Sequence, residues 1–442
     1  DVTNYRPISV TSCCSRVLER IVRFKLASYL QEHHILLDTQ HGFQAGKSTD
    51  SALVHFYDYV TRERDLNKVV EAVFFDFSKA FDRIPHHLLI QRLKAVGISG
   101  VLLKWFTNFL KDRLQKVRIG GSSSQLLRVT SGVIQGSVLG PTLFNIYING
   151  IDYSVKYCHL IKYADDLRIF LSSKKDYVSF SELRRNIQHD IDSIVAWAEE
   201  SCMSLNASKC FQVTFGHVLE LTALPYSISG NSLPHKNDTS FKDLGLTVTS
   251  SKLFKNHIDS VVSKAYQRLG LINKIFTNKS QSCLLKLYKA FVRPIVEYSS
   301  VTWNPHTVGS IDKIERVQKR MTKMIPNLRA LTYRDRLKVL NLLSLQARRL
   351  RSQLLYVFKM RCDSSGINLT DLFTYAKIEN RPTRGHAAKI SLKNARNNYR
   401  LHFFTVSIID AWNKLPESAV SASSVAHFKK ELSSYFNKEN IW

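Results

Sequence analysis

The most continuous run of hydrophobic residues lies at 69–75, where the sequence reads VVEAVFF. A run of this length, rich in β-branched and aromatic residues, is typical of a central strand that is buried on both faces. Between residues 15 and 34, by contrast, apolar residues recur every three or four positions. That spacing predicts an amphipathic helix, so the chain combines strands with helices from its first segments onward.

The pattern keeps this mixture up to about residue 250 and then changes. From about 252 it is mostly helical, residues 361–400 are polar and irregular, and 402–440 again reads as helical. Before 250 we expect helices at 88–114 (with a break at Gly97–Gly100), 141–149 and 177–201, hairpins at 115–133 and 159–171, and strands near 210–215 and 241–248.

Charge divides the chain at nearly the same place. The 442 residues include 63 Lys and Arg against 36 Asp and Glu, which gives a formal net charge of +27. Between 251 and 360 there are 22 basic and 5 acidic residues, a surplus of 17. So one-sided a surplus predicts contact with a polyanion, and nucleic acid is the first candidate.

Neither a membrane protein nor a disulfide scaffold is expected. No run approaches the roughly 18 apolar residues of a spanning helix, and the first residues do not read as a signal peptide. The seven cysteines lack the spacing of a disulfide framework or a zinc knuckle, which fits a reducing, intracellular setting. Because Asp1 already lies inside what reads as a motif, we expect a fragment of a longer polyprotein.

Aspartates stand at the ends of two predicted strands. Asp76 follows the run at 69–75, and Asp165 and Asp166 occupy the turn of the hairpin at 159–171. If these strands are neighbours, three carboxylates converge at one sheet edge and repel one another unless a cation lies between them. Mg²⁺ prefers such ligands, and two ions roughly 3.5–4 Å apart promote phosphoryl transfer. A solvated turn is the simpler explanation of an isolated Asp-Asp pair, but it does not explain the apolar flanks or Asp76.

Several segments together resemble the reverse transcriptases of non-LTR retrotransposons, in particular those of jockey-like and chicken-repeat-like LINE elements. The long gap between the first two palm motifs favours this type over retroviral enzymes. Three segments resemble the palm motifs of this family: VFFDFSKAFD (73–82), GVIQGSVLGPTLFNIYIN (132–149) and YADD (163–166). Two segments resemble its fingers motifs: NYRPISV (4–10) and QHGFQAGKST (40–49). WAEESCMSLNASKC (197–210) and FKDLGL (241–246) resemble the next two motifs in order. FVRPIVEYSSVTWNP (291–305) and IERVQKRMTKMIP (314–326) resemble the thumb region.

The resemblance implies an α+β fold, the right-hand polymerase of fingers, palm and thumb. Its palm is an antiparallel sheet, and a helical C-terminal region follows. On this basis we expect fingers and palm at 1–250, a basic helical thumb at 251–360, and a C-terminal region of unassigned role at 361–442. The endonuclease of such elements would lie before Asp1.

The resemblance also assigns the chemistry to particular residues. It makes Asp76, Asp165 and Asp166 the ligands of two Mg²⁺ ions, for which Mn²⁺ can substitute. Lys209 matches a lysine that protonates the pyrophosphate leaving group. From the residues alone, Lys209 could equally be a plain surface lysine.

The nucleotide-binding residues that the same motifs imply are Arg6, Lys47, Phe77 through its backbone carbonyl, Phe81, Gln135 and Gly136. Phe81 matches the gate beneath the nucleotide sugar, where a bulky ring would clash with a 2′-hydroxyl. A core aromatic is its alternative interpretation. Gln135 and Gly136 match the loop that packs against nucleotide and template, and glycine permits a close backbone approach.

The nucleic-acid contacts are implied further along the chain. Leu244 and Gly245 match the primer grip, although the pair is just as well a strand end. Five cations of one predicted helix follow i, i+3, i+4 spacing, so several share a face and would contact phosphates. They are Lys313, Arg316, Lys319, Arg320 and Lys323.

The function implied is that of an RNA-directed DNA polymerase, which extends a DNA 3′-hydroxyl on an RNA template during target-primed reverse transcription. Its partners would be the RNA template, the DNA primer or target and dNTPs, with no membrane. It would act in the nucleus at integration and travel before that in a cytoplasmic ribonucleoprotein. One alternative is an RNA-dependent RNA polymerase, against which Phe81 and the YADD context speak. The other is a catalytically inactive or domesticated nucleic-acid-binding remnant, against which the three intact aspartates speak.

Overall fold

A four-stranded antiparallel sheet forms the centre of the first of two contact units. The computed structural model describes residues 5, 8–216, 225–362, 364–376 and 386–439. Contacts group Asp1–Gln44 with Val69–His235 as the first unit, and Ala45–Lys68 with Lys236–Trp442 as the second. The sheet of the first unit has the order β6 (His159–Tyr163), β7 (Asp166–Ser173), β1 (Val69–Phe75), β8 (Phe211–Phe215), and each pair is antiparallel.

All seven residues of the central strand β1 are buried, which explains its apolar run without alternation. Glu71 is the charged exception. Its carboxylate accepts hydrogen bonds from Thr214 Oγ1 at 3.0 Å and from Tyr226 Oη, and Arg184 lies 3.4 Å away. Burial raises the pKa of the Glu71 carboxyl, and these partners oppose the rise. A buried acid is tolerated here because its oxygens are bonded.

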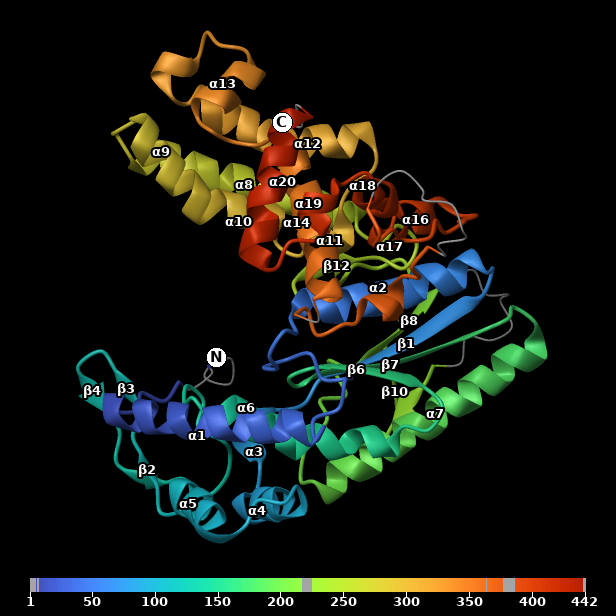
Figure 1. Cartoon of the computed structure of the whole chain (residues 1–442). Helices are drawn as coiled ribbons and strands as arrows, with labels where there is room; N and C mark the ends of the chain where they lie inside the picture. Colours follow the sequence, from blue (N-terminus) through green and yellow to red (C-terminus); the bar gives the residue numbers. More distant parts are fainter. Residues whose placement is uncertain (1–4, 6–7, 217–224, 363, 377–385, 440–442) are drawn as a thin grey trace. The chain divides into compact units, whose positions relative to one another are not determined.

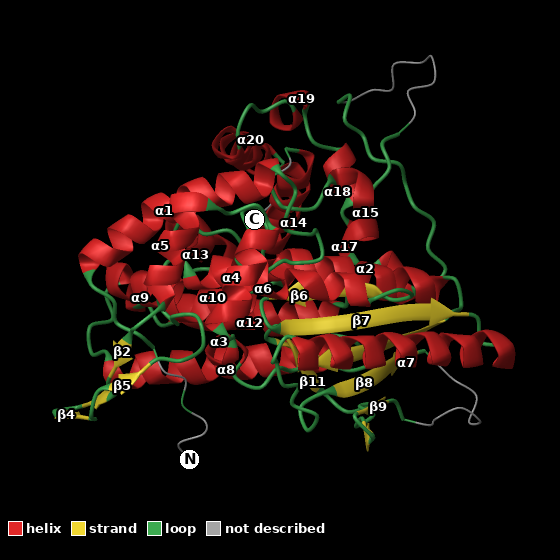
Figure 2. Cartoon of the chain, turned by 90° about the horizontal axis from the view of Figure 1, so that it is seen from below, coloured by secondary structure: helices red, strands yellow, loops and turns green. Residues whose placement is uncertain are grey.

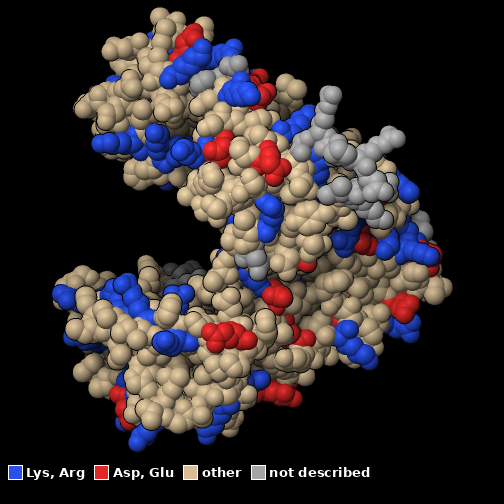
Figure 3. Space-filling model, in the orientation of Figure 1, with Lys and Arg blue, Asp and Glu red and all other residues tan. Residues whose placement is uncertain are grey.

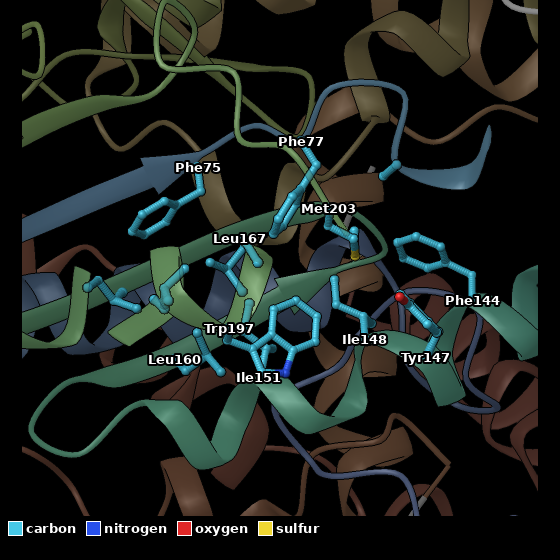
Figure 4. Packing of buried hydrophobic residues seen from close by; sticks show 14 of the residues in the cluster. Phe75, Phe77, Phe144, Tyr147, Ile148, Ile151, Leu160, Leu167, Trp197 and Met203 are labelled. Atoms are coloured by element: carbon cyan, nitrogen blue, oxygen red, sulfur yellow. The ribbon is translucent and has the colours of Figure 1, made fainter. Parts of the chain in front are cut away.

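Helices supply the rest of the first unit's core. α7 (Tyr177–Glu200) runs along the sheet beside β7, as both cartoon views show (Figure 1, Figure 2). Figure 4 shows Phe75 and Leu167 of the sheet packed with Trp197 of α7. The other helices are α1 (Cys13–Glu32), α3 (Ala80–Arg83), α4 (His86–Ala95), α5 (Gly100–Leu110), α6 (Gly140–Ile148) and a 3₁₀ turn at Asn149–Ser154.

A narrow hairpin extends from the first unit between α5 and α6. Its outer and inner pairs are antiparallel, and every residue from 114 to 128 is exposed. The predicted hairpin at 115–133 is therefore confirmed, with pairing that begins one residue earlier. Its strands are β2 (Leu114–Gln115), β3 (Arg118–Ile119), β4 (Ser122–Ser123) and β5 (Leu127–Arg128), and a separate short pair is β9 (Ser227–Ile228) with β10 (Asn231–Ser232).

The second unit is mostly helical. It contains one two-stranded hairpin, β11 (Phe241–Asp243) with β12 (Leu246–Val248), and four long helices: α2 (Thr49–Asp65), α8 (Lys255–Ile275), α12 (Val308–Lys323) and α14 (Leu345–Arg361). The shorter helices are α9 (Gln281–Leu287), α10 (Arg293–Glu297), α11 (Ser300–Trp303), α13 (Tyr333–Val339), α15 (Leu369–Leu372), α16 (Asn398–Leu401), α17 (Phe404–Ser407), α18 (Ile409–Asn413), α19 (Glu417–Val420), α20 (Val425–Lys438) and a 3₁₀ turn at Pro326–Leu328.

α9 and α10 form one continuous rod through a π-helical segment at Tyr288–Val292. Pro294 explains the change of helix type. Proline has no backbone N–H, so it cannot donate to the carbonyl four residues earlier, and its ring crowds that carbonyl. A π turn widens the helix at this place and relieves the crowding.

A buried ion pair joins α2 to the C-terminal segment within the second unit. Arg400 Nη1 lies 2.7 Å from Asp58 Oδ1, and both side chains are almost fully buried. Thr405 Oγ1 donates to the same carboxylate oxygen, and Arg62 lies 3.5 Å from the other one. These contacts explain why residues 45–68 group with the C-terminal half of the chain.

The expected α+β fold, with an antiparallel sheet and a helical C-terminal region, is confirmed. Two local predictions are wrong: the strand at 241–248 is a hairpin, and the helical segment at 402–440 is broken into four helices. Within the described ranges, no helix has the length and apolar character needed to cross a bilayer. The functional division at 250 and 360 stays a prediction.

Candidate active site

Asp76 and Asp166 lie opposite each other at one edge of the central sheet. The last paired residues of β1 and β7 are Phe75 and Leu167, so continuing this antiparallel register by one residue places Asp76 opposite Asp166. Directly opposed residues have Cα atoms about 4.5–5.5 Å apart. The two-residue turn between β6 and β7 is Ala164-Asp165, so Asp165 lies in the turn, whereas Asp166, also predicted to lie there, is the first residue of β7. The structure therefore brings the three predicted carboxylates to one sheet edge.

Gln40 and Gly42 hold the turn that carries these aspartates. Ala164 has φ +57°, a left-handed conformation that is strained for a residue with a Cβ. Gln40 Oε1 accepts from the Ala164 amide at 2.9 Å, and its Nε2 donates to the Ala164 carbonyl at 3.4 Å. A Cβ on Gly42 would lie 2.4 Å from Ala164 N. This role of the QHG segment could not be predicted from the sequence, because only the fold brings residues 40 and 164 together.

Lys209 lies beside the first aspartate. Its Nζ is 3.7 Å from Asp76 Oδ2, and the two side chains are 67% and 36% exposed. A backbone bridge fixes this neighbourhood, because Ser78 N donates to Ser204 O at 2.8 Å and Asn206 N donates to Asp76 O at 2.7 Å. The carbonyl of Asp76 accepts a hydrogen bond in this bridge, whereas the carbonyl of Phe77 does not take part in it. The Phe77 carbonyl is the predicted additional metal ligand.

A cysteine packs behind the same aspartate. The Asp76 amide donates to Cys210 Sγ at 3.4 Å. Burial raises the pKa of the Cys210 thiol to about 11, and the nearby Asp76 charge acts in the same direction. Cys210 therefore stays a neutral thiol at physiological pH and supports the backbone of Asp76 as a packing residue.

The donor set suits a hard divalent cation, although the side chains do not form a closed metal site. Within the described residues, no group of three or more His, Cys, Asp or Glu side chains is arranged to hold a metal ion. Mg²⁺ at phosphoryl-transfer sites is usually held by one or two carboxylates together with substrate phosphates and water. Opposed Asp76 and Asp166 with adjacent Asp165 fit that open mode of binding.

Phe81 lies in a cluster of three aromatic rings. Its ring stacks on Phe144 with centroids 4.0 Å apart and planes 13° from parallel, and it meets Phe43 edge to face at 6.2 Å. Phe144 is fully buried, whereas Phe43 is 50% exposed. Phe81 is thus half-buried between the core and the surface, a placement compatible with both the gate and the core interpretation.

The loop with Gln135 and Gly136 is held on two sides. Ser9 N donates to Gln135 O at 2.7 Å, and Gln135 Nε2 donates to Asp82 Oδ1 at 2.7 Å. Gly136 has φ +100°, and a Cβ there would lie 2.6 Å from Ser9 O. Both the conformation and the close approach therefore require glycine.

Two further cations, in the predicted fingers motifs, were expected to bind the nucleotide. Arg6 lies outside the described residues. Lys47 belongs to the second unit, where its side chain and backbone leave no room for a Cβ on Gly366. Their roles at a nucleotide stay predictions.

Leu244 and Gly245 form the turn of the β11–β12 hairpin, which corrects the predicted single strand. Their φ values are +43° and +87°, both left-handed. Tyr298 Oη donates to Leu244 O at 2.8 Å, and a Cβ on Gly245 would lie 3.1 Å from the Tyr298 ring. The YSS segment at 298–300 thus supports this turn.

Three of the five predicted thumb cations are paired with acids. Lys313 Nζ lies 2.7 Å from Asp259, while Lys319 and Arg316 lie 3.3 and 3.9 Å from Asp312.

The other two cations, Arg320 and Lys323, line a cleft of about 530 Å³ together with Lys279 and Arg329. No acid lines this cleft, and within the described residues none of the four cations forms an ion pair. Figure 3 shows basic side chains gathered on the part of the second unit formed by α8 and α9. Lys279 and Arg329 were missed because they follow helices instead of sharing the face of α12.

The sequence matches the family described as reverse transcriptase (RNA-dependent DNA polymerase) over residues 1–248. It is 28% identical over 336 residues to the probable RNA-directed DNA polymerase from transposon BS of Drosophila melanogaster, and 26% identical over 335 residues to the RNA-directed DNA polymerase from mobile element jockey of Drosophila funebris. These alignments cover 73% and 74% of this chain but 36% of each relative, so the chain spans little more than a third of their length.

Among solved structures, apo telomerase from Candida tropicalis aligns with a TM-score of 0.42 at 12% sequence identity. The alignment covers 74% of this chain and 53% of the telomerase chain. The jockey and transposon BS relatives confirm the expected resemblance to non-LTR retrotransposon enzymes. Because the family match spans more than half of its residues, the chain belongs to the reverse transcriptase (RNA-dependent DNA polymerase) family.

Proposed function

We propose that this chain is the polymerase part of a non-LTR retrotransposon protein and extends a DNA 3′-hydroxyl on an RNA template. One observation carries the proposal beyond family membership. The strand-end aspartates Asp76 and Asp166 are opposed across β1 and β7, with Asp165 beside them and Lys209 Nζ 3.7 Å from Asp76. This is the charge arrangement that phosphoryl transfer from a nucleoside triphosphate needs.

The carboxylates would hold the reacting groups in line. Asp76, Asp165 and Asp166 are the proposed ligands of two Mg²⁺ ions. When bound, such ions would activate the attacking 3′-hydroxyl and stabilise the charge on the leaving oxygen. The Gln40 bonds to Ala164 keep the Asp165 turn in place, so the site needs little rearrangement when substrate arrives.

Lys209 is the proposed proton donor to the leaving pyrophosphate. It is mostly exposed, so its ammonium can leave Asp76 and reach a phosphate oxygen. The bridge between 76–78 and 204–206 keeps the lysine loop close to Asp76 during that movement. A donor held near the leaving group contributes to the rate through general acid catalysis.

Phe81, Gln135 and Gly136 are the proposed nucleotide contacts. The stack of Phe81 on buried Phe144 fixes the ring, so it cannot turn aside to admit a 2′-hydroxyl. Gly136, whose missing Cβ lets the backbone lie against Ser9 O, keeps the loop of Gln135 in place.

The basic cleft of the second unit is the proposed grip on the template–primer duplex. Lys279, Arg320, Lys323 and Arg329 line it without a competing acid. Such cations hold register through phosphates without reading sequence. Leu244 and Gly245, fixed by Tyr298, are the proposed primer grip.

We further propose target-primed synthesis, in which a nicked chromosomal strand supplies the primer. That role places the protein in the nucleus at integration and in a cytoplasmic ribonucleoprotein before it. These points rest on the relatives, which are transposon polymerases.

Primer extension by the purified chain tests the proposal. An RNA template with a DNA primer should be extended with dNTPs and Mg²⁺, and much less with rNTPs. Asp165→Asn should abolish extension and leave hybrid binding nearly unchanged, whereas Asp112→Asn, in the exposed turn before the hairpin, should extend like the parent. Comparable extension by Asp165→Asn would overturn the metal assignment. A parent that binds the hybrid but extends nothing would favour the inactive remnant.

A further inference from the structure

Arg349 places a positive charge in the interior of the second unit. It lies on α14, which packs against α11 and α12 (Figure 1), and it is 1% exposed. Its Nε donates to Asn304 Oδ1 at 2.9 Å, whereas Nη1 and Nη2 are buried and have no hydrogen-bond partner among the described residues. A guanidinium has donors only, and a buried donor without an acceptor is costly. Two of its three nitrogens therefore lack the acceptor that burial requires.

A second buried donor lies one helical turn further along α14. Gln353 follows Arg349 by four residues, so the two side chains share a face of the helix. Because Arg349 Nε can only donate, it must face the Asn304 oxygen, and the Asn304 nitrogen then donates to Gln353 Oε1 at 3.4 Å. The free end of the Gln353 amide is thus Nε2, which is buried and also lacks an acceptor within the described part of the chain. Asn304 therefore orients both side chains, and the atoms left without partners on them are all donors.

The acids that act on Arg349 are bonded to other groups. Burial lowers the pKa of Arg349 to about 10, and the charges of Glu315 and Glu297 oppose this fall. Glu315 accepts from two backbone amides at the start of α14, at 3.0 and 3.2 Å, and Glu297 is bound through both oxygens by Arg348. Arg349 is therefore still charged at physiological pH, and its charge has no carboxylate in contact among the residues described.

We infer that Arg349 and Gln353 bind a small monovalent anion, of which chloride is the abundant physiological example. An anion accepts hydrogen bonds from every side and so suits a position where only donors remain. A water molecule could also accept from these donors, but its own hydrogens would then need acceptors, and it carries no charge. One negative charge balances the one guanidinium, and complete burial limits the anion to a small size.

Such an anion should stabilise the folded chain by mass action, because the unfolded chain does not assemble the site. Chloride should replace gluconate at constant ionic strength in this experiment, since gluconate is too large for a buried position. The unfolding temperature should rise by about 3–6 °C once chloride exceeds its dissociation constant tenfold. This chloride rise is measured relative to Arg349→Met, which removes the charge and reports the general effect of exchanging the two salts. A buried charge is often replaced by an apolar side chain of similar volume without loss of the fold.

Two further variants separate anion binding from a merely structural role of Arg349. In Gln353→Glu one carboxylate oxygen still accepts from Asn304, and the other supplies the acceptor and the negative charge that Arg349 lacks. This variant should melt higher than the parent in gluconate and show no chloride rise. Arg348→Met is the matched control, because it removes the neighbouring charge of the same helix and breaks the pair with Glu297. It should melt lower than the parent in both salts and keep the chloride rise.

Thermal melts of the full chain and its three variants, in mixtures of potassium chloride and potassium gluconate, test the inference. A chloride rise in the parent and in Arg348→Met that is absent from Arg349→Met and Gln353→Glu would support it. Equal responses of the parent and Arg349→Met would overturn it, as would a chloride rise in a folded Gln353→Glu, which serves alone if Arg349→Met does not fold.

Crystals grown with bromide in place of chloride give a direct test, because bromide scatters anomalously. An anomalous peak within hydrogen-bond distance of Arg349 Nη1 or Nη2 would support the anion site, and a water only at that position would overturn it. Neither experiment measures primer extension, so the outcome does not depend on the proposed function.

Discussion

Replacing Arg320 and Lys323 of α12 by Gln should flatten the salt dependence of binding to an RNA–DNA hybrid. Replacing Lys313 and Lys319 of the same helix should change it much less. Both variants lose two positive charges from one helix, so their net charge is identical. A difference between them therefore reports on local contacts and not on the overall field of the protein.

The structure predicts the difference from the partners of these cations. Lys313 and Lys319 already lie 2.7 and 3.3 Å from aspartates, so a phosphate would have to compete for them. Arg320 and Lys323 face a cleft without acidic lining residues, and Arg320 lies over the Tyr266 ring at 5.4 Å. Only the second pair is arranged to replace the counterions of a phosphate backbone.

The magnitude follows from counterion release. Each neutralised phosphate of a B-form duplex contributes about −0.9 to the slope of log K against log salt, and a hybrid duplex should be similar. Two lost contacts should make the slope shallower by about 1.8 units. Between 50 and 200 mM salt the parent should then lose about tenfold more affinity than the cleft variant. For the variant that lacks Lys313 and Lys319, the slope should change by less than the value of one phosphate contact, that is, by under about 0.9 units.

Fluorescence anisotropy with two hybrids of unrelated sequence, titrated at several KCl concentrations, gives these slopes. The loss should be the same for both sequences, because phosphate contacts carry no sequence information. Equal slope changes for the two variants, or a larger change for Lys313 and Lys319, would refute the assignment of the cleft.

Other predictions concern the gate, pH and stability. Phe81→Val should raise rNTP incorporation relative to dNTP by about tenfold, equivalent to relief of about 1.4 kcal/mol, and unchanged single-turnover selectivity would exclude the gate. Burial and two nearby lysines lower the pKa of His257 to about 4, so the unfolded state binds more protons between pH 6.5 and 4. Stability should therefore fall on acidification through that window, by up to about 3 kcal/mol, and His257→Gln should remove this part of the pH dependence in urea titrations. Arg400→Met should cost about 3–5 kcal/mol in urea unfolding because Asp58 stays buried, whereas Lys414→Met, in an exposed pair, should leave unfolding unchanged.

Local sequence patterns predicted the elements that fix the carboxylates. The bounds of β1 agree with the run at 69–75 to the residue, because a strand buried on both faces needs an unbroken apolar sequence. The hairpin at 159–171 is confirmed because its Ala164-Asp165 turn interrupts two apolar segments. The strand and the hairpin depend on which residues are buried, and the spacing of apolar residues along the sequence indicates this directly.

The failures occur where distant residues decide the structure. The segment 241–248 reads as one strand, yet it turns at Leu244 because Tyr298 bonds that carbonyl. Asp243 is kept in the hairpin by a hydrogen bond from Tyr57 Oη at 2.8 Å, and Tyr57 lies 186 residues earlier in the chain. No local pattern contains these partners, so propensity gave the wrong element.

The same limit applies to the candidate sites. Spacing on one helix identified Arg320 and Lys323 but could not separate them from three neighbours that lie in ion pairs with two aspartates. It also could not find Lys279 and Arg329, which reach the same cleft from outside α12. Charge sums predict that a surface binds a polyanion, whereas pairing decides which cations are available to it.

Two adjacent aspartates at a turn require a fold that holds them against their repulsion. Lys209 can offset only a small part of it, because half-exposed ion pairs are worth about 0–1 kcal/mol. The left-handed Ala164 adds strain of about 1–2 kcal/mol. Gln40 bonds both the amide and the carbonyl of Ala164 from a buried position, and two such bonds contribute about 1–3 kcal/mol. The turn is thus stabilised through its backbone while its carboxylates keep a surplus of negative charge, and that surplus is what a cation–triphosphate substrate would meet.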